Sequence, residues 1–301
     1  MSVENGFKAA EMNIEKIKYI IAVIIYGTNG MMIRFVDLPS SAIVFYRALI
    51  GTITIYVILK LKGHKIDRPS VRKNMAVLTV SGVCLGLNWV FLFAAYKVTT
   101  VAIASLCNYT APIIVIIILA VYNRRRPGLS TIMCVIAAAA GIVMVSGVLE
   151  GGADNVNAAG IAFGMAAAAG FVGIVLCNRR LKSIDVFDKT VVQMAIAAIV
   201  IFIYMFVENG CLPIPGNAVS AILLLVLGIV NTGIAYIFYF GGMSSISVES
   251  VAILGYLEPV VSILMSVFVL KESLTAIGII GAVLLLGAAA WNELSQAKKN
   301  E

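Results

Sequence analysis

The sequence predicts an all-α integral membrane protein whose ten transmembrane helices form two inverted five-helix repeats. Three observations lead to this prediction: the composition, a series of long apolar segments, and a second half that matches the first. Hydrophobic residues make up 61% of the 301 residues and charged residues only 12%, and the mean hydropathy is +1.03. Water-soluble domains do not approach these values.

The apolar segments have the length and pattern of membrane-spanning helices. A helix needs about 20 apolar residues to cross the hydrocarbon core, whereas a barrel strand needs about 10 alternating ones. The segments here are long and do not alternate, and we expect spans over residues 17–35, 41–60, 74–95, 98–121, 129–148, 158–178, 187–207, 218–240, 245–270 and 274–291. The first segment is too long for a signal-peptide core, so we expect it to be retained.

Charges, glycines and prolines separate these segments in chain order. In the first half, the separators are residues 36–40, 61–73, 96–97 and 122–128, and in the second half they are 179–186, 208–217, 241–244 and 271–273. We therefore expect five regions: an N-terminal tail (1–16), a first repeat (17–148), an outer linker (149–157), a second repeat (158–291) and a C-terminal tail (292–301). The short connections leave no room for a separate soluble domain.

The distribution of basic residues predicts the orientation in the cytoplasmic membrane. Basic residues near span ends are retained in the cytoplasm. If both termini are cytoplasmic, the tails and inner loops hold eighteen of the 22 Lys and Arg residues, and only Arg34, Arg47, Lys97 and Lys271 fall elsewhere. The net charge of +7 is dispersed over several loops, which favours contact with anionic lipid and argues against a nucleic-acid partner.

The cysteines and the single histidine predict neither a metal site nor a cofactor. Four cysteines lie within spans and Cys211 lies in an outer loop, without a CxxC pair. His64 lies in a basic inner loop, with no second histidine or carboxylate at ligand spacing along the chain. A Walker A motif for ATP is also missing from the sequence.

The two halves match when the chain is shifted by 147 residues. The stretch that starts GLNWVFLFAAYK at Gly86 then aligns without a gap to the stretch that starts GIAYIFYFGGMS at Gly233. Tyr109 pairs with Tyr256, and Pro112 pairs with Pro259. Because each half has an odd number of spans, the second copy enters from the opposite face, which gives inverted repeats. Such repeats suit alternating access to a central cavity.

These residues resemble the EamA branch of the drug/metabolite transporter superfamily. The resemblance rests on the doubled five-span unit and on the motifs FYRALIG (45–51), NYTAP (108–112), YLEP (256–259) and LKESLTAIGIIGAVLLLGAAA (270–290). It covers nearly the whole chain and implies a central cavity lined by the first, third, fourth, sixth, eighth and ninth spans. It also implies a small-metabolite substrate, commonly an amino acid or a related compound, and often export.

Glu258 is the strongest candidate for a functional side chain. Counted from Ser245, it lies roughly 20 Å into its span, near the bilayer centre. A charge there costs about 2.5 to 3.5 kcal/mol on insertion scales, so we expect Glu258 to be protonated, paired, or facing a wet cavity. The following Pro259, like Pro112 in the first half, predicts a hinge. Glu258 would then bind a substrate amine or accept a proton, or else serve as a fixed partner for Arg47.

Arg47 has two interpretations that stay open at the level of sequence. It lies roughly 9 Å deep in a span entered from outside, so its side chain could extend outward to the interface. Alternatively, it is a cavity cation that pairs with Glu258 or with a substrate carboxylate. Glu249, nine residues before Glu258, falls on the other helical face, and we expect it near the inner mouth.

Amides and aromatic rings in equivalent spans complete the predicted site. Rings can stack on an apolar group of a substrate, and amides can bind its polar ends. Each residue alone is as readily explained by packing or interhelix hydrogen bonds. The set contains Asn29, Asn88, Trp89, Asn108, Tyr109, Asn231, Tyr236 and Tyr256.

A secondary transporter that works by alternating access is the function these features favour. Its partners would be the lipid bilayer and a small-molecule substrate. The sequence leaves open whether transport is coupled to a proton gradient and whether the protein is a monomer or a homodimer. A channel or a non-transporting structural subunit is the alternative. An intramembrane enzyme is disfavoured, because it would need paired aspartates, a Ser-His dyad or ligating histidines, and every aspartate falls in a loop or at a span edge.

Overall fold

The computed structural model describes residues 2–122, 129–145, 149, 158–243, 246, 251 and 254–300. Within these residues every regular element is a helix, which confirms the all-α prediction. Six of the described helical segments are long and apolar enough to cross a membrane, and three shorter apolar helices accompany them. The long segments are Ser40–Leu61, Arg68–Val98, Val101–Leu119, Ala158–Asn178, Val186–Asn209 and Ala218–Met243.

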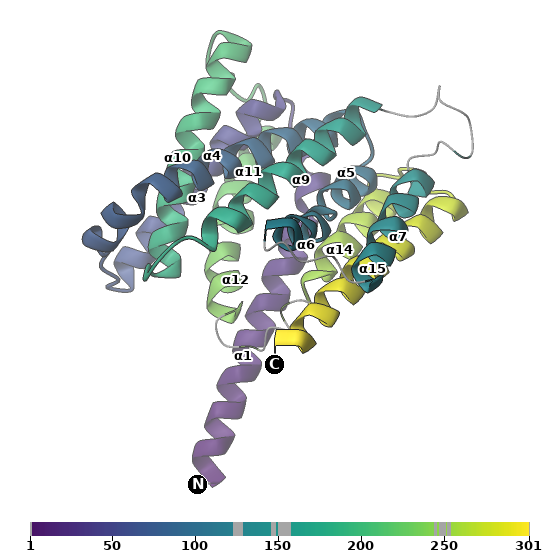
Figure 1. Cartoon of the computed structure of the whole chain (residues 1–301). Coiled ribbons are helices and arrows are strands. Elements are labelled where there is room, and N and C mark those ends of the chain that lie inside the picture. Colours follow the sequence, from purple (N-terminus) through teal and green to yellow (C-terminus); the bar gives the residue numbers. More distant parts are fainter. Residues whose placement is uncertain are drawn as a thin grey trace.

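The first half begins with a helix that extends away from the bundle towards the N-terminus (Figure 1). The helices are α1 (Ser2–Gly27), α2 (Asn29–Arg34), α3 (Ser40–Leu61), α4 (Arg68–Val98), α5 (Val101–Asn108), α6 (Ala111–Tyr122) and α7 (Leu129–Val145). Asp67 caps α4 by accepting from the Ser70 backbone N–H, and Thr100 caps α5 through Ile103. The α4 cap and Pro69 extend this helix six residues beyond the predicted span.

The second half follows the same order of spans. Its helices are α9 (Ala158–Asn178), α10 (Val186–Asn209), α11 (Ala218–Gly228), the π-helix η2 (Ile229–Ile234), α12 (Ala235–Met243), α14 (Leu257–Leu264), the π-helix η3 (Met265–Val269) and α15 (Ala276–Asn300). Asp185 caps α10 by accepting from the backbone N–H groups of Phe187 and Asp188. Gly210 ends α10 in the left-handed region, at φ 68°.

Several predicted spans are broken where the sequence analysis expected continuous helices. The span at 98–121 divides into α5 and α6 at Tyr109–Thr110, and α14 begins just after the equivalent Tyr256. Pro112 and Pro259 each lie in the first turn of the helix that follows, where the missing N–H has no helical partner to lose. The two halves thus place a new helix N-terminus at matching depths of the bundle.

Small residues allow the helices that surround the centre to approach closely. A Cβ atom added to Gly170 of α9 would lie 2.9 Å from the Asn88 backbone nitrogen of α4, and one added to Gly164 would lie 2.6 Å from the Cβ of Cys107 in α5. The pairs α4–α9, α10–α4 and α1–α12 surround the centre, while α7 and α15 lie side by side at one edge (Figure 1). Glycine at these contacts is typical of membrane helix packing.

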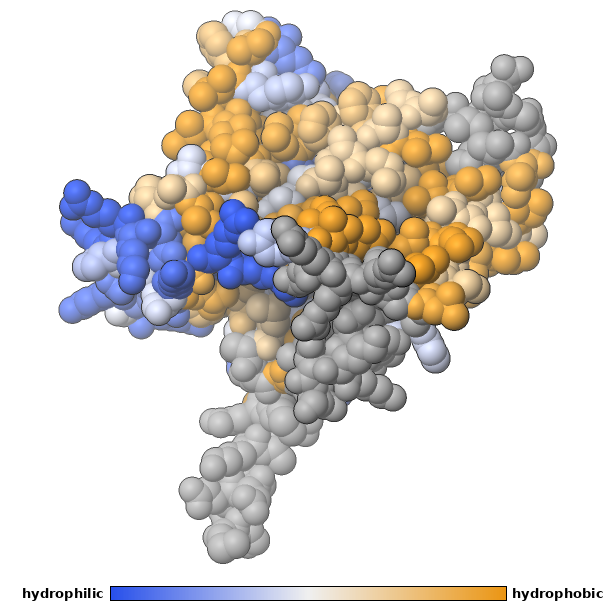
Figure 2. Space-filling view, viewed as in Figure 1, coloured by the Kyte–Doolittle hydropathy of each residue, from blue (hydrophilic) through white to orange (hydrophobic). Residues whose placement is uncertain are grey.

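The outer surface is apolar over much of its height (Figure 2). On α10, Ile199, Phe202, Ile203 and Phe206 are exposed at helical spacing, as expected for a face that contacts lipid. Hydrophilic residues gather mainly at the left of Figure 2, with a smaller group at its top. We call the end with residues 62–67 and 179–185 the basic end, and the end with residues 35–39 and 210–217 the opposite end.

Candidate functional site

A cavity of about 510 Å³ lies between the two halves. Its walls come from α1, α2, α3, α4, α5, α6, α9, α10, α12 and α14, so they include the six spans implied by the resemblance together with α3 and α10. At the basic end the lining reaches Asn178, Lys189 and Met243, which are near the ends of their helices. The cavity volume falls within the usual range for small-molecule sites.

Most of the predicted site residues line this cavity. Asn231 and Pro259 do not, and both are buried behind its wall. The residues that line it are Asn29, Arg47, Asn88, Trp89, Asn108, Tyr109, Pro112, Tyr236, Tyr256 and Glu258. Glu249, expected near the mouth, lies outside the described residues.

Arg47 is buried within the bundle and does not extend to the interface, since its residue is only 4% exposed. Its Nε donates a 2.8 Å hydrogen bond to Thr232 Oγ1 in η2. The guanidinium carbon lies 4.5 Å from the Trp89 ring centroid and 5.2 Å from that of Phe93, within the range of cation–π contact. These three contacts fix the plane of the guanidinium group at the cavity wall.

Glu258 occupies the first turn of α14, where the helix dipole favours a negative charge. The Tyr109 hydroxyl, from the matching break of the first repeat, lies close enough to its carboxyl group to interact with it. Within the described chain, no carboxylate oxygen lies within 4.0 Å of an Arg47 nitrogen, so the Arg47–Glu258 ion pair, one of the alternatives that the sequence left open, is not formed in this structure. The cavity therefore presents a cation and an acid as separate groups.

The amides of the site bridge the helices. Asn88 Nδ2 donates to Asn108 Oδ1 at 3.1 Å and to the Ala167 carbonyl at 2.7 Å. Asn231 Nδ2 lies 3.1 Å from Asn29 Oδ1 and 3.0 Å from the Ile25 carbonyl, which holds η2 against α1. These contacts are the interhelix hydrogen bonds that the sequence analysis gave as an alternative role for the amides. They also set the shape of the cavity wall.

Aromatic rings cover much of the cavity wall between the first and eighth spans. The Tyr236 ring lies 5.7 Å from that of Tyr26 and 6.4 Å from that of Trp89. The Tyr109 and Tyr256 rings lie 6.4 Å apart across the two repeats. These separations suit edge-to-face packing and leave faces that could stack on an apolar group.

Several lining residues were missed by the sequence analysis. They are Tyr26 and Tyr239 in the first and eighth spans, Tyr96 in the third, and Lys189 and Gln193 in the seventh. Tyr26 precedes Asn29 by three residues, and Lys189 precedes Gln193 by four. In an unbroken helix each pair would share a face, and this spacing along the sequence is the signal that could have identified them.

A network around Glu272 joins several helices at the opposite end. Arg34 at the end of α2 donates to Glu272 Oε1 at 2.7 Å and also to the Thr99 carbonyl. The Val101 backbone N–H at the start of α5 donates to Glu272 Oε2 at 2.9 Å, and the Ser266 hydroxyl donates to the same oxygen. The carboxylate thus joins the second repeat to two helix ends of the first.

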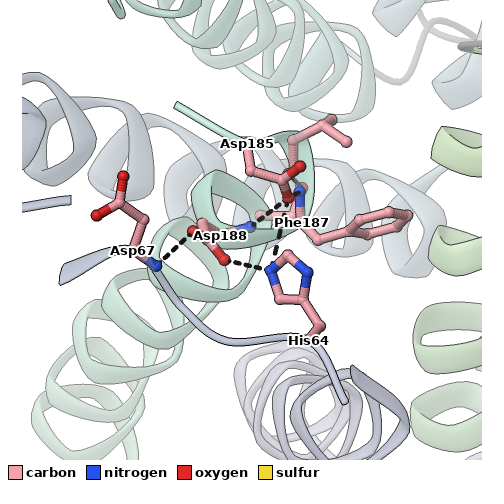
Figure 3. A network of polar contacts seen from close by, with 7 residues as sticks. His64, Asp67, Asp185, Phe187 and Asp188 are labelled. Atoms are coloured by element: carbon pink, nitrogen blue, oxygen red, sulfur yellow. Dashed lines mark hydrogen bonds and ion pairs between the residues drawn. The ribbon is translucent and has the colours of Figure 1, made fainter. Parts of the chain in front are cut away.

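A second polar cluster, at the basic end, corrects the sequence analysis of His64 (Figure 3). The fold brings two carboxylates to the histidine: Nε2 lies 2.7 Å from Asp188 Oδ1 and 3.8 Å from Asp185 Oδ1. The Asp67 backbone N–H donates to the other Asp188 oxygen at 2.9 Å. The spacing along the chain could not reveal this, because the partners are more than a hundred residues apart.

The composition of this cluster is one that could hold a metal ion, since the three ligand atoms lie within 4.8 Å of one another. Hydrogen bonds within the protein already engage them, however. Asp188 is bound by His64 and Asp67, and Asp185 accepts from the Phe187 backbone N–H at 2.8 Å as the cap of α10. We interpret the cluster as a link between residues 64–67 and the start of α10.

Comparison with protein families matches residues 16–147 and 158–292 to the EamA-like transporter family. Among curated proteins, an uncharacterized transporter, YxxF, of Bacillus subtilis (strain 168) is 24% identical over 269 residues, covering 88% of this chain and 85% of the relative. An uncharacterized inner membrane transporter, YicL, of Salmonella typhimurium is 20% identical over 293 residues, covering 93% and 95%. One crystal structure aligns with a TM-score of 0.61 at 19% identity, over 93% of this chain and 98% of the other, which shows a shared fold.

Proposed function

The chain belongs to the EamA-like transporter family and is a multi-pass membrane transporter, and we propose that it is a secondary transporter for a small zwitterion, an amino acid or a related compound. One observation carries the proposal. Arg47 and Glu258 line the same cavity, yet they are not paired with each other. Separate charges inside a membrane protein are costly unless they serve a polar pathway or a ligand.

A zwitterion carries groups that are complementary to both side chains. Its carboxylate can accept two parallel hydrogen bonds from the guanidinium of Arg47, whose plane is set by Thr232 and Trp89. Its ammonium group can bind the carboxylate of Glu258. The aromatic rings around Tyr26 and Tyr236 then offer apolar contact to the rest of the molecule.

Alternating access is supported by the different states of the two ends. The cavity lining extends to Lys189 and Met243 at the basic end, whereas Arg34 and Glu272 join the repeats at the opposite end. We take the basic end to be cytoplasmic, because most Lys and Arg residues gather there. The substrate then loads from the cytoplasm, and the proposed direction is export.

Coupling to a proton gradient is part of the proposal, and it rests on Glu258. This is the only carboxylate among the described residues that line the cavity. Burial disfavours the ionised form of a carboxylic acid that has no cation within ion-pair distance. Protonation of Glu258 when the site is empty and release of the proton when an ammonium group binds would link the two fluxes.

The test is transport by the purified, full-length protein in liposomes. Candidate substrates are amino acids, quaternary amines and nucleosides, each measured with and without a pH gradient. We expect saturable counterflow of amino acids, in which unlabelled substrate inside the liposomes accelerates uptake of labelled substrate. Non-saturable flux without counterflow would indicate the channel alternative, and counterflow of nucleosides alone would overturn the zwitterion assignment.

A further inference from the structure

The cavity holds a second cation that the proposed function does not use. Lys189 lines the cavity at the basic end, in the first turn and a half of α10. Its Nζ lies 5.8 Å from the centroid of the Phe240 ring, which lines the same cavity. Together these contacts direct the ammonium group of Lys189 into the mouth of the cavity, rather than outward to lipid headgroups.

Among the described residues, no neighbouring acid forms an ion pair with this lysine, although Asp185, four residues earlier, attracts its charge from a greater distance. Asp188, the preceding residue, is bound by His64 and by the Asp67 backbone N–H on another face of α10. Asp185 is engaged as the helix cap. In the part of the chain that the structure describes, no carboxylate oxygen lies within 4.0 Å of Lys189 Nζ.

The position of Lys189 is also not explained by the stability of its helix. A cation near a helix N-terminus opposes the helix dipole, at a cost of about 0.3 to 1 kcal/mol, which the attraction of Asp185 at i,i+4 offsets by only about 0.2 to 0.5 kcal/mol. Other basic residues also lie at this end of the molecule, as expected for a cytoplasmic face. Lys182 and Arg180 are exposed and do not line the cavity, so a cytoplasmic location alone does not require a lysine inside it. A role for Lys189 inside the cavity accounts for both the position and the direction of its side chain.

The charges of the described lining residues give the cavity a positive character. Arg47 and Lys189 are cations, and Glu258 is the one carboxylate. The net charge of these three side chains is positive whether Glu258 is ionised or protonated. A neutral zwitterion satisfies Arg47 and Glu258 but leaves Lys189 without an anionic partner among the described residues that line the cavity.

We infer that Lys189 selects substrates with a second anionic group, namely zwitterions whose side chain carries a carboxylate, such as acidic amino acids. This inference rests on the proposed function. The substrate's main carboxylate would bind Arg47, its ammonium group would bind Glu258, and its side-chain carboxylate would point towards Lys189 at the mouth.

The test compares substrate pairs that differ in charge but hardly in shape. Counterflow of L-glutamate and L-glutamine, and of L-aspartate and L-asparagine, is measured with the full-length protein in liposomes. We expect the wild type to prefer the acidic member. Lys189→Gln should lower the acidic-to-amide ratio of kcat/KM about tenfold, which corresponds to about 1.4 kcal/mol.

Two variants serve as controls for folding and for charge. Lys189→Arg keeps the cation and should retain the wild-type ratio, so a loss confined to Lys189→Gln is not a folding defect. Lys182→Gln removes an exposed lysine at the same end and should also leave the ratio unchanged. Wild-type preference for the amides, or an unchanged ratio in Lys189→Gln, would overturn the inference alone. Absence of transport for every zwitterion in the panel would overturn the proposed function as well.

Discussion

At the scale of single residues, the break in the ninth span explains how Glu258 is tolerated. In a continuous helix, the backbone N–H groups beside its carboxyl group would all be engaged in helical hydrogen bonds and could not donate to it. The new helix begins at Leu257, so Glu258 lies in a first turn whose N–H groups carry partial positive charge. The Tyr109 hydroxyl adds a polar interaction from the other repeat. These interactions offset part of the cost of a buried acid and leave the group able to change partners.

Replacing Glu258 with glutamine separates its charge from its shape. Glu258→Gln keeps the size of the side chain and an oxygen that can accept from Tyr109, but it cannot carry a negative charge. We expect the affinity for ammonium-bearing substrates to fall about tenfold, or about 1.4 kcal/mol, and the effect of a pH gradient on uptake to disappear. The measurement is KM in counterflow with and without the gradient. Unchanged affinity together with unchanged pH dependence would remove Glu258 from the site.

At the scale of elements, the contact between α4 and α9 depends on glycine. The nearest atoms to a Cβ on Gly170 belong to the Asn88 backbone, at 2.9 and 3.0 Å, and backbone cannot move aside as a flexible side chain can. Gly170→Ala should therefore destabilise the protein by about 1 to 3 kcal/mol, the usual cost of overpacking. The measurement is thermal unfolding in detergent micelles.

Gly287 provides a matched control for this substitution. It lies within α15, and nothing lies within 4 Å of an added Cβ. Gly287→Ala should leave the stability unchanged or raise it by about 0.5 to 1 kcal/mol, because alanine favours the helix. Equal stability of the two variants would show that close contact between α4 and α9 is not required.

The network around Glu272 is expected to hold the opposite end closed. Glu272→Gln removes the charge that binds Arg34 while preserving the size of the side chain. Loss of about 1.5 kcal/mol, typical of a hydrogen bond to a charged group, would change the ratio of open to closed molecules about tenfold. Spin labels at Phe35 and Val269, both exposed near this end, would report a longer and broader distance distribution.

A carboxylate elsewhere at the same end controls for the change in charge. Glu208 is exposed at the end of α10, so Glu208→Gln should leave the spin-label distances as they are in the wild type. The labelled proteins carry Cys211→Ser to remove the exposed native thiol. Identical distributions in Glu272→Gln and in the wild type would argue against a closing role for the network.

The positions of spans could be predicted from sequence, but their internal breaks could not. Hydropathy reports the length of an apolar segment and is insensitive to a change from α- to π-helix, as at Asn231–Thr232. That change depends on tertiary contacts, because Asn231 binds α1 and Thr232 binds Arg47. Pro112 and Pro259 lie just after two of these breaks, where proline constrains the backbone locally, and their role as hinges stays a prediction.

At the scale of the whole molecule, the repeat explains why the site was partly predictable. Tyr109 and Tyr256 occupy equivalent positions of inverted halves, and such positions meet near the symmetry axis. Lys189 and the partners of His64 follow no repeat and were missed. Their placement depends on how α10 packs against α3 and α4. The spacing of residues along the sequence does not predict this packing.

The orientation of the whole molecule in the membrane is the last prediction. If the basic end is cytoplasmic, Cys211, exposed at the opposite end, faces the outside. A membrane-impermeant maleimide should then label intact cells that express the wild type, and Cys211→Ser should abolish the labelling.

A cysteine at the other end completes this test of orientation. In the Cys211→Ser background, Lys65→Cys introduces an exposed thiol in the loop after α3. It should react only after the membrane is permeabilised, because lysine- and arginine-rich loops are retained in the cytoplasm. Labelling of Lys65→Cys from outside, with protection of Cys211, would place the cavity mouth and Lys189 on the external side. Transport would then load from outside, and the proposed export would become uptake.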